Sequence, residues 1–123
     1  ENLATSADIW PEHPCCVLVV SKKFLHEHPQ KVAAVIRAHI RATEFIQENP
    51  GEAVRIGTKY TGMDEETVAQ ALRTVHYTPQ LSIEGELEYV RFLHELGYIK
   101  VSDPKQFVQE LMHSQLLDKI LAE

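Results

Sequence analysis

Long apolar stretches are missing from this sequence: no run exceeds six residues, and the longest is residues 15–20. A helix that crosses a bilayer needs about 20 apolar residues, so we predict no such helix. No basic segment followed by an apolar one opens the sequence, so we expect no signal peptide within it, and the first residue is Glu1 rather than Met. We expect that processing or a sequence boundary removed what came before.

Cysteine is scarce: the sequence contains only Cys15 and Cys16, which are neighbours. Two adjacent cysteines are no disulfide framework, and no CxxC spacing for zinc or redox chemistry occurs. Adjacent side chains of a strand point to opposite faces, so we expect no ordinary bridge between them. We interpret both as small apolar core residues.

Positive charge is also limited, and the net charge is −6. Residues 1–62 hold seven basic and seven acidic residues, whereas residues 63–123 hold five basic and eleven acidic. Nucleic-acid binding depends on a basic stripe or patch, which this sequence lacks, so we expect no nucleic-acid partner. The acidic half is typical of a solvated face.

Helix signals follow one another from Ser21 to the end of the sequence. Capping residues or N1 prolines precede stripes of period 3.6, and Gly62 and Gly97 stand where helices should end. We predict about six helices, which begin after Ser21, at Pro29, at Pro50, after Asp64, after Ser82 and at Pro104. A final amphipathic stretch contains residues 116–121.

Residues 15–20 differ from the rest, because six apolar residues without alternation and rich in Val predict a strand covered on both faces. The sequence therefore predicts a mainly α chain with one principal strand. We divide residues 1–123, taken as a single unit, into a crossover or loop at 1–14, the strand at 15–20 and a helical part at 21–123. The sheet that this strand needs is not evident, so we expect it in a preceding segment.

A family resemblance rests on motifs in a fixed order: WPEHPCCVLVVS at residues 10–21, then SKKFL, HP, ATEFI and ENP, and later YTP, LGYI and DP. This series resembles the nitrate/sulfonate/taurine solute-binding family. The resemblance implies the carboxy-terminal fragment of an α/β two-lobed (type II) periplasmic-binding-protein fold. Two such lobes close on a small solute by a hinge motion.

The function that the resemblance implies is that of a solute-binding component of an ABC importer. Its ligand would be a small anionic or zwitterionic solute, such as nitrate, a sulfonate or a taurine-like compound, shared with a missing lobe. The resemblance also implies an extracytoplasmic location, a membrane permease as partner, no cofactor and no enzymatic activity.

Candidate ligand-binding residues are Trp10 and His13, just before the expected strand, and Tyr77 in an extended step before Pro79. Their ring N–H and O–H groups suit an anion, although packing in a loop or turn explains them as well. We expect no metal site, because His26 and His28 are two residues apart and HExxH requires a spacing of four. No catalytic nucleophile motif occurs.

Alternative interpretations remain open at this stage. One is a free-standing helical module that binds a protein partner. Another is a relative of the pyrimidine-precursor synthases on the same fold, although these carry a longer cysteine cluster than the present pair. We also expect an exposed strand at residues 15–20 to pair two copies of the chain into a homodimer.

Overall fold

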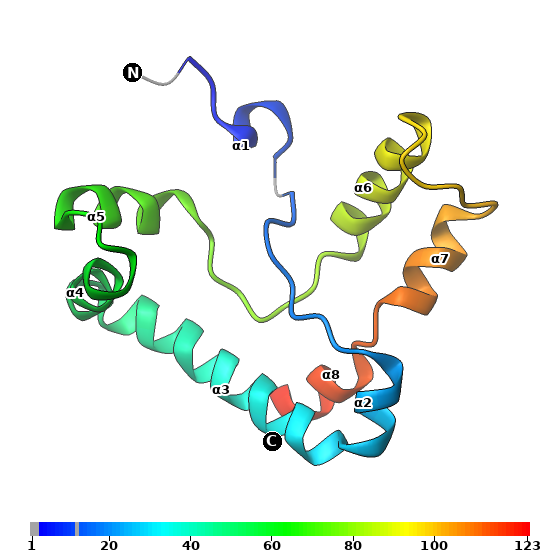
Figure 1. Ribbon diagram of the computed structural model, residues 1–123, viewed down its shortest axis with the longest axis horizontal. Helices are drawn as coiled ribbons and strands as arrows, with labels where there is room; N and C mark the ends of the chain where they lie inside the picture. The colour runs from blue at the N-terminus through cyan, green and yellow to red at the C-terminus, as the bar shows by residue number, and fades with distance from the viewer. Residues whose placement is uncertain (1–2, 12) are drawn as a thin grey trace. The chain divides into compact units, whose positions relative to one another are not determined.

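The structure is a computed structural model that describes residues 3–11 and 13–123. Within these residues the regular secondary structure is helical and no strand is formed, which confirms the mainly α class. The helices, labelled in Figure 1, are α1 (Ser6–Ile9), α2 (Lys22–Glu27), α3 (Pro29–Glu48), α4 (Pro50–Thr61), α5 (Glu65–Thr74), α6 (Ile83–Glu95), α7 (Pro104–Leu111) and α8 (Gln115–Leu121).

The chain divides into two compact units. Unit 1 combines Glu1–His26 with Leu81–Glu123, and unit 2 is Glu27–Gln80.

Most helices begin where a short polar side chain accepts the orphan backbone N–H groups of the first turn. Asp64 accepts from Thr67 N, Ser82 from Gly85 N, and Asp103 from both Lys105 N and Gln106 N. At Asp64 these bonds, the backbone N–H of Thr67 first, lower the pKa of the carboxyl. The predicted starts of α5, α6 and α7 are therefore confirmed.

The start of α4 differs in detail from the capping that the sequence suggests. Asn49 occupies the N-cap position, yet its side chain makes no capping bond and its Nδ2 donates instead to Phe45 O of the preceding helix. Pro50 at the first helical position fixes the backbone there without that bond. Glu52 pairs with Arg55 one turn on, an exposed contact that contributes little stability.

Unit 2 is built by packing α4 against both α3 and α5. Its buried side chains are Val32, Thr43, Ala53 and Val68. Thr43 is polar, but its Oγ1–H donates to His39 O of its own helix at 3.0 Å, so the hydroxyl is satisfied. His39 itself is exposed, so it is not a packed core residue of α3.

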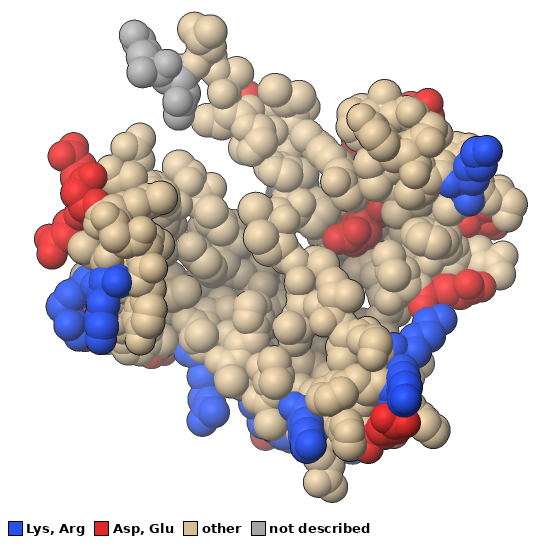
Figure 2. Space-filling view, in the orientation of Figure 1, with Lys and Arg blue, Asp and Glu red and all other residues tan. Residues whose placement is uncertain are grey.

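Close approach of α4 and α5 depends on a glycine. A side-chain carbon added at Gly57 would lie 2.7 Å from Val68 Cγ1, closer than real carbon atoms approach. Gly57 therefore lets the buried Val68 of α5 rest directly on the α4 backbone. Figure 2 shows that acidic side chains lie over α5 and basic ones over α4 on the outside of this pair.

Unit 1 contains the packed pair α6 and α7. Val90 and Val108 are buried at 4% and 2% exposure, and Ile120 of α8 is buried as well. Gly97 ends α6 with φ +77°, a left-handed conformation that glycine adopts without strain. The N–H of Tyr98 then bonds Leu93 O at 2.9 Å, which closes the last turn before the chain passes to α7.

Residues 15–20 correct the sequence-based expectation, because they form no strand in the described structure. Strand structure is defined by a hydrogen-bonded partner, and no second strand exists in residues 3–11 and 13–123 to supply one. Val17, Leu18, Val19 and Val20 are 49%, 51%, 79% and 37% exposed. The apolar run is present, but the layers that should cover it are not.

The first fourteen residues also depart from the expected loop. Helix α1 forms there, because Thr5 and Asp8 make a capping box that satisfies backbone N–H groups in both directions. Residues 1, 2 and 12 of this stretch lie outside the described residues. No helix in the described ranges is long and apolar enough to cross a membrane.

The packing of α4 against α5 predicts opposite effects for two Gly-to-Ala changes in one helix. Gly57→Ala should lower the free energy of unfolding by about 1 kcal/mol, because the clash with stiff Val68 outweighs the gain in helix propensity. Gly51→Ala, where nothing lies within 4 Å, should raise it by about 0.5 kcal/mol. Urea denaturation followed by circular dichroism measures both, and equal effects would contradict the close approach.

Candidate functional site

Trp10 lies at the end of α1, in a position fixed by the capping box. Asp8 Oδ2 accepts from both the backbone N–H and the hydroxyl of Thr5 at 2.7 Å. These bonds, the one from the hydroxyl first, lower the pKa of Asp8. The N–H of Trp10 then bonds Ser6 O at 2.8 Å and ends the single helical turn, so the indole leaves α1 in a defined direction.

The indole of Trp10 rests on one side of α6. Its Nε1–H donates to Glu88 Oε2 at 2.9 Å, a bond that joins segments 78 residues apart. Its ring stacks on Tyr89 with centroids 5.6 Å apart and meets Phe92 at a tilt, with centroids 6.5 Å apart. Aromatic pairs at such separations stabilise by about 0.5–1.5 kcal/mol beyond the burial of their area.

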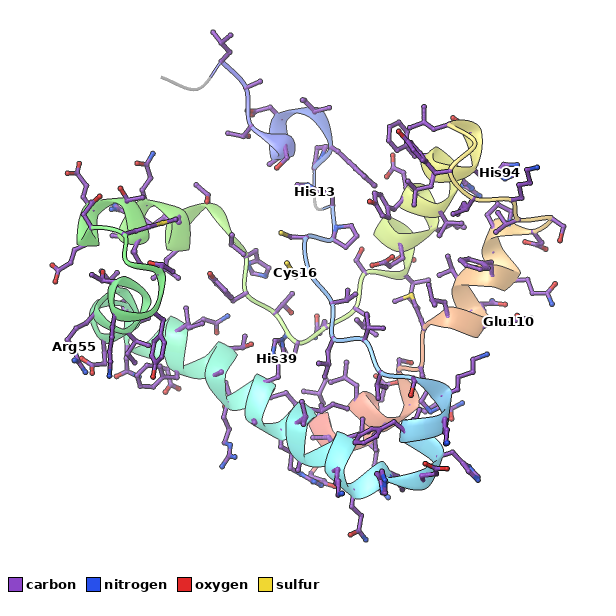
Figure 3. The ribbon with its side chains drawn as sticks, in the orientation of Figure 1. His13, Cys16, His39, Arg55, His94 and Glu110 are labelled. Carbon is purple, nitrogen blue, oxygen red and sulfur yellow. The ribbon has the colours of Figure 1, made fainter. Side chains whose placement is uncertain are left out.

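His13 completes this group, and we call Trp10, His13, Tyr89 and Phe92 the aromatic cluster. The His13 ring stacks on Trp10 with centroids 5.8 Å apart, and its Nδ1 lies 2.8 Å from Trp10 O. Because a carbonyl oxygen can only accept, the proton of this bond belongs to Nδ1. Figure 3 shows His13 on the irregular segment that follows α1.

Pro14 continues the contact between this segment and α6. Gly85, a buried residue in the first turn of α6, has no side chain, and an added carbon there would lie 2.9 Å from Pro14 Cδ. The chain is therefore held against α6 at Trp10 and at Pro14.

The polar groups of the aromatic cluster are largely committed to one another. The indole N–H is donated to Glu88, and His13 Nδ1–H is donated to Trp10 O. His13 Nε2 is a lone-pair acceptor in the neutral ring and becomes a donor only when the ring is protonated. The cluster as it stands thus presents ring faces, the hydroxyl of Tyr89 and one carboxylate. For Trp10 or His13 themselves to donate to an anion, His13 must be protonated or the Trp10–Glu88 bond must open.

Tyr77, the third candidate residue, belongs to unit 2. It is half-buried in the stretch after α5, and its carbonyl oxygen accepts from Gln47 Nε2 of α3 at 2.7 Å. This bond ties the connection after α5 to α3. The structure brings Trp10 and His13 together in unit 1, whereas Tyr77 is placed by contacts of its own unit.

Cys15 and Cys16 are both exposed and both free thiols. Their Sγ atoms lie 3.7 Å apart, within reach of a weak sulfur hydrogen bond. That bond, and next the charge of a second thiolate nearby, raise the pKa of the Cys15 thiol. The interpretation of the pair as buried core residues with diverging side chains is therefore wrong, because the segment that carries them is not in a sheet.

Two other features of the described part of the chain bear on a possible site. A hollow at the junction of α2 and α3 is lined by five consecutive residues, 27–31, so no segment distant in the sequence contributes to it. No group of three or more His, Cys, Asp or Glu side chains in residues 3–11 and 13–123 is arranged to hold a metal ion.

Sequence reasoning missed the α6 side of the aromatic cluster. Glu88, Tyr89 and Phe92 are not among the candidate residues that the sequence indicates. Their spacing of three residues places the two rings on one side of a helix, a signal that was available. Nothing in the sequence, however, says that Trp10 is the residue that lies on them.

The Trp10–Glu88 bond can be tested by fluorescence, because Trp10 is the only tryptophan in the chain. Glu88→Ala removes the acceptor, so we expect red-shifted emission and stronger quenching by iodide as the indole becomes more exposed. Glu84→Ala, one turn earlier on the same helix, is the matched control and should leave both signals unchanged. Unchanged emission in the Glu88 variant would show that this bond does not hold the indole.

Comparison with known families gives one match, to a family described as NMT1-like, over residues 1–57. The matched stretch is less than half of the chain and contains Trp10, His13, both cysteines and the apolar run. Comparisons with curated proteins and with solved structures give no significant match. Residues 1–57 are thus similar to a solute-binding-type family of the nitrate/sulfonate/taurine kind.

Proposed function

We propose that this chain is the carboxy-terminal part of a two-lobed solute-binding protein that serves an ABC importer. Its ligand is a small anionic or zwitterionic solute, such as nitrate, a sulfonate or a taurine-like compound, held between the lobes. The single observation that carries the proposal is the match of residues 1–57 to a solute-binding-type family. A binding role without catalysis follows from that assignment.

The state of residues 15–20 supports the proposal independently. Four large apolar side chains in a row are between 37% and 79% exposed, and the segment makes no backbone hydrogen bonds within the described structure. Burying one such side chain is worth about 1.5–3 kcal/mol, so the run favours a covered position. The sheet of an α/β lobe, in which strands are apolar on both faces, provides that position.

Ligand contact is assigned in this proposal to Trp10, His13 and Tyr77. The first two lie together within the matched stretch, next to the segment that would enter the sheet. Ligand sites favour the interface between domains, and residues 1–14, as the crossover between the lobes, would bring Trp10 and His13 to that interface. Trp10 would offer its ring face or, after release from Glu88, its N–H, and protonated His13 would offer Nε2–H.

The remaining parts of the proposal follow from the importer assignment. The partners would be the solute, shared with the missing lobe, and the membrane permease of the importer. The location would be extracytoplasmic, in the periplasm or anchored at the outer face of the membrane. No cofactor is required, because binding by hinge closure needs only contacts from two lobes.

Solute binding should require both lobes. In a thermal-shift screen of the full two-lobed protein against nitrate, sulfonates and taurine, one class should stabilise it, by about 2.7 kcal/mol at roughly 100 times Kd. Calorimetry of the 123-residue chain with the same solutes should show no micromolar site, because one lobe supplies only part of the contacts.

Two variants of the full protein test whether His13 contacts the solute or only packs in the aromatic cluster. His13→Ala should weaken solute binding at least tenfold, and His26→Ala, an exposed histidine of α2, should not change it. A one-to-one micromolar isotherm for the 123-residue chain alone would contradict the two-lobe proposal. Equal affinities for both histidine variants would remove His13 from the site.

Residues 15–20 should also pair two copies of the chain when no sheet covers them, since exposed strand-forming segments template pairing. We expect light scattering to detect a homodimer of the 123-residue chain. Val17→Lys together with Val19→Lys should convert it to a monomer, because the charges would be buried in the pairing. Tyr60→Lys, at a side chain 79% exposed in unit 2, is the matched control. A dimer that survives both Val changes would place the interface elsewhere.

A further inference from the structure

The two adjacent cysteines combine three features that no part of the solute-binding proposal uses. Both side chains are exposed, both thiols are free, and their Sγ atoms are 3.7 Å apart. The segment that carries them has neither helical nor strand hydrogen bonds, so the peptide between them is not held by a ladder. Figure 3 labels Cys16 on this segment, beyond His13.

We propose that Cys15 and Cys16 form a redox-active dithiol, which closes to a disulfide between adjacent residues on reaction with a small-molecule disulfide. The proposal rests on the juxtaposition of two accessible sulfur atoms at 3.7 Å on an irregular segment anchored at Pro14. It goes beyond solute binding, because it assigns chemistry to residues that contact no solute in the function proposed above.

The reaction balances with a disulfide RSSR as oxidant. One cysteine thiolate attacks a sulfur of RSSR, forms a mixed disulfide and releases RS⁻. The second thiolate attacks the protein-side sulfur, forms the Cys15–Cys16 bond and releases the second RS⁻. The dithiol loses two electrons, RSSR gains two, and the two thiol protons pass to the two RS⁻ groups.

Proximity makes the second step fast, because the attacking sulfur is already in contact with its target. The same proximity limits the stability of the product. Adjacent Cα atoms are about 3.8 Å apart across a trans peptide, below the roughly 4.4–6.8 Å that disulfides prefer. Strained disulfides are more easily reduced, so this one belongs with labile bonds and not with structural ones.

Ring closure and strand pairing exclude each other. In a paired strand the two side chains would point to opposite faces, which separates the thiols. The dithiol reaction is therefore a property of the chain with residues 15–20 unpaired, as they are here. The solute-binding proposal does not depend on it, and the test below does not involve solute.

The test keeps residues 15–20 unpaired, by dilution to the monomer or with Val17→Lys and Val19→Lys, treats the 123-residue chain with oxidised glutathione and follows it by intact-mass spectrometry. The expected product is a monomeric species lighter by two hydrogen atoms, with neither thiol open to alkylation, and excess reduced glutathione should restore the dithiol. The rate should rise with pH, because the raised pKa of Cys15 limits its thiolate at neutral pH. Far-UV circular dichroism should not change, since neither cysteine is in a helix.

Two single variants complete the design. Cys15→Ser and Cys16→Ser should each accumulate one glutathione adduct, because the thiol that would expel it is gone. Three results would overturn the proposal: no reaction of the wild-type chain, a persistent glutathione adduct on it, or disulfide-linked dimers as the main product on non-reducing gels. A ring that resists excess reduced glutathione would contradict its assignment as a labile bond.

Discussion

A single extended segment cannot satisfy its own backbone, and this constraint governs residues 15–20 and what surrounds them. Peptide N–H and C=O groups of a strand need a partner strand, whereas a helix pairs them internally. Every long element described here is a helix, so the chain offers the apolar run no ladder. The valine and leucine side chains of the run are left exposed to solvent, although its composition suits a covered position.

The same contrast explains how much of the fold could be predicted from the sequence. Asp64, Ser82 and Asp103 cap helices through bonds that reach two or three residues along the chain, so local sequence determines them. A strand depends on pairing with residues distant in the sequence, and the prediction of one at residues 15–20 failed because the described residues form no partner strand. Helix α1 is also a local feature, because its capping box joins Thr5 and Asp8. The sequence contains this signal, but it was overlooked.

The candidate site likewise combines local contacts, which the sequence indicates, with a long-range contact, which it does not. Trp10 and His13 were identified from their place before the apolar run, and their mutual stacking spans three residues. Glu88 lies 78 residues from Trp10, and nothing in the pattern of either segment predicts the bond between them. That bond changes the chemistry expected of Trp10, since an indole N–H already donated to a carboxylate is not available to an anion without a cost in hydrogen bonding.

The contact of Pro14 with Gly85 lies between the aromatic cluster and the cysteine pair. The close contact of these residues fixes Pro14 on α6, so the aromatic cluster before it and the cysteines after it differ in how firmly they are held. Before Pro14, stacking and two hydrogen bonds define one arrangement. After it, an extended pairing would separate the thiols, and the observed irregular course brings them to 3.7 Å. Whatever covers residues 15–20 therefore also decides whether Cys15 and Cys16 can react with each other, because one backbone segment cannot satisfy a ladder and a ring at once.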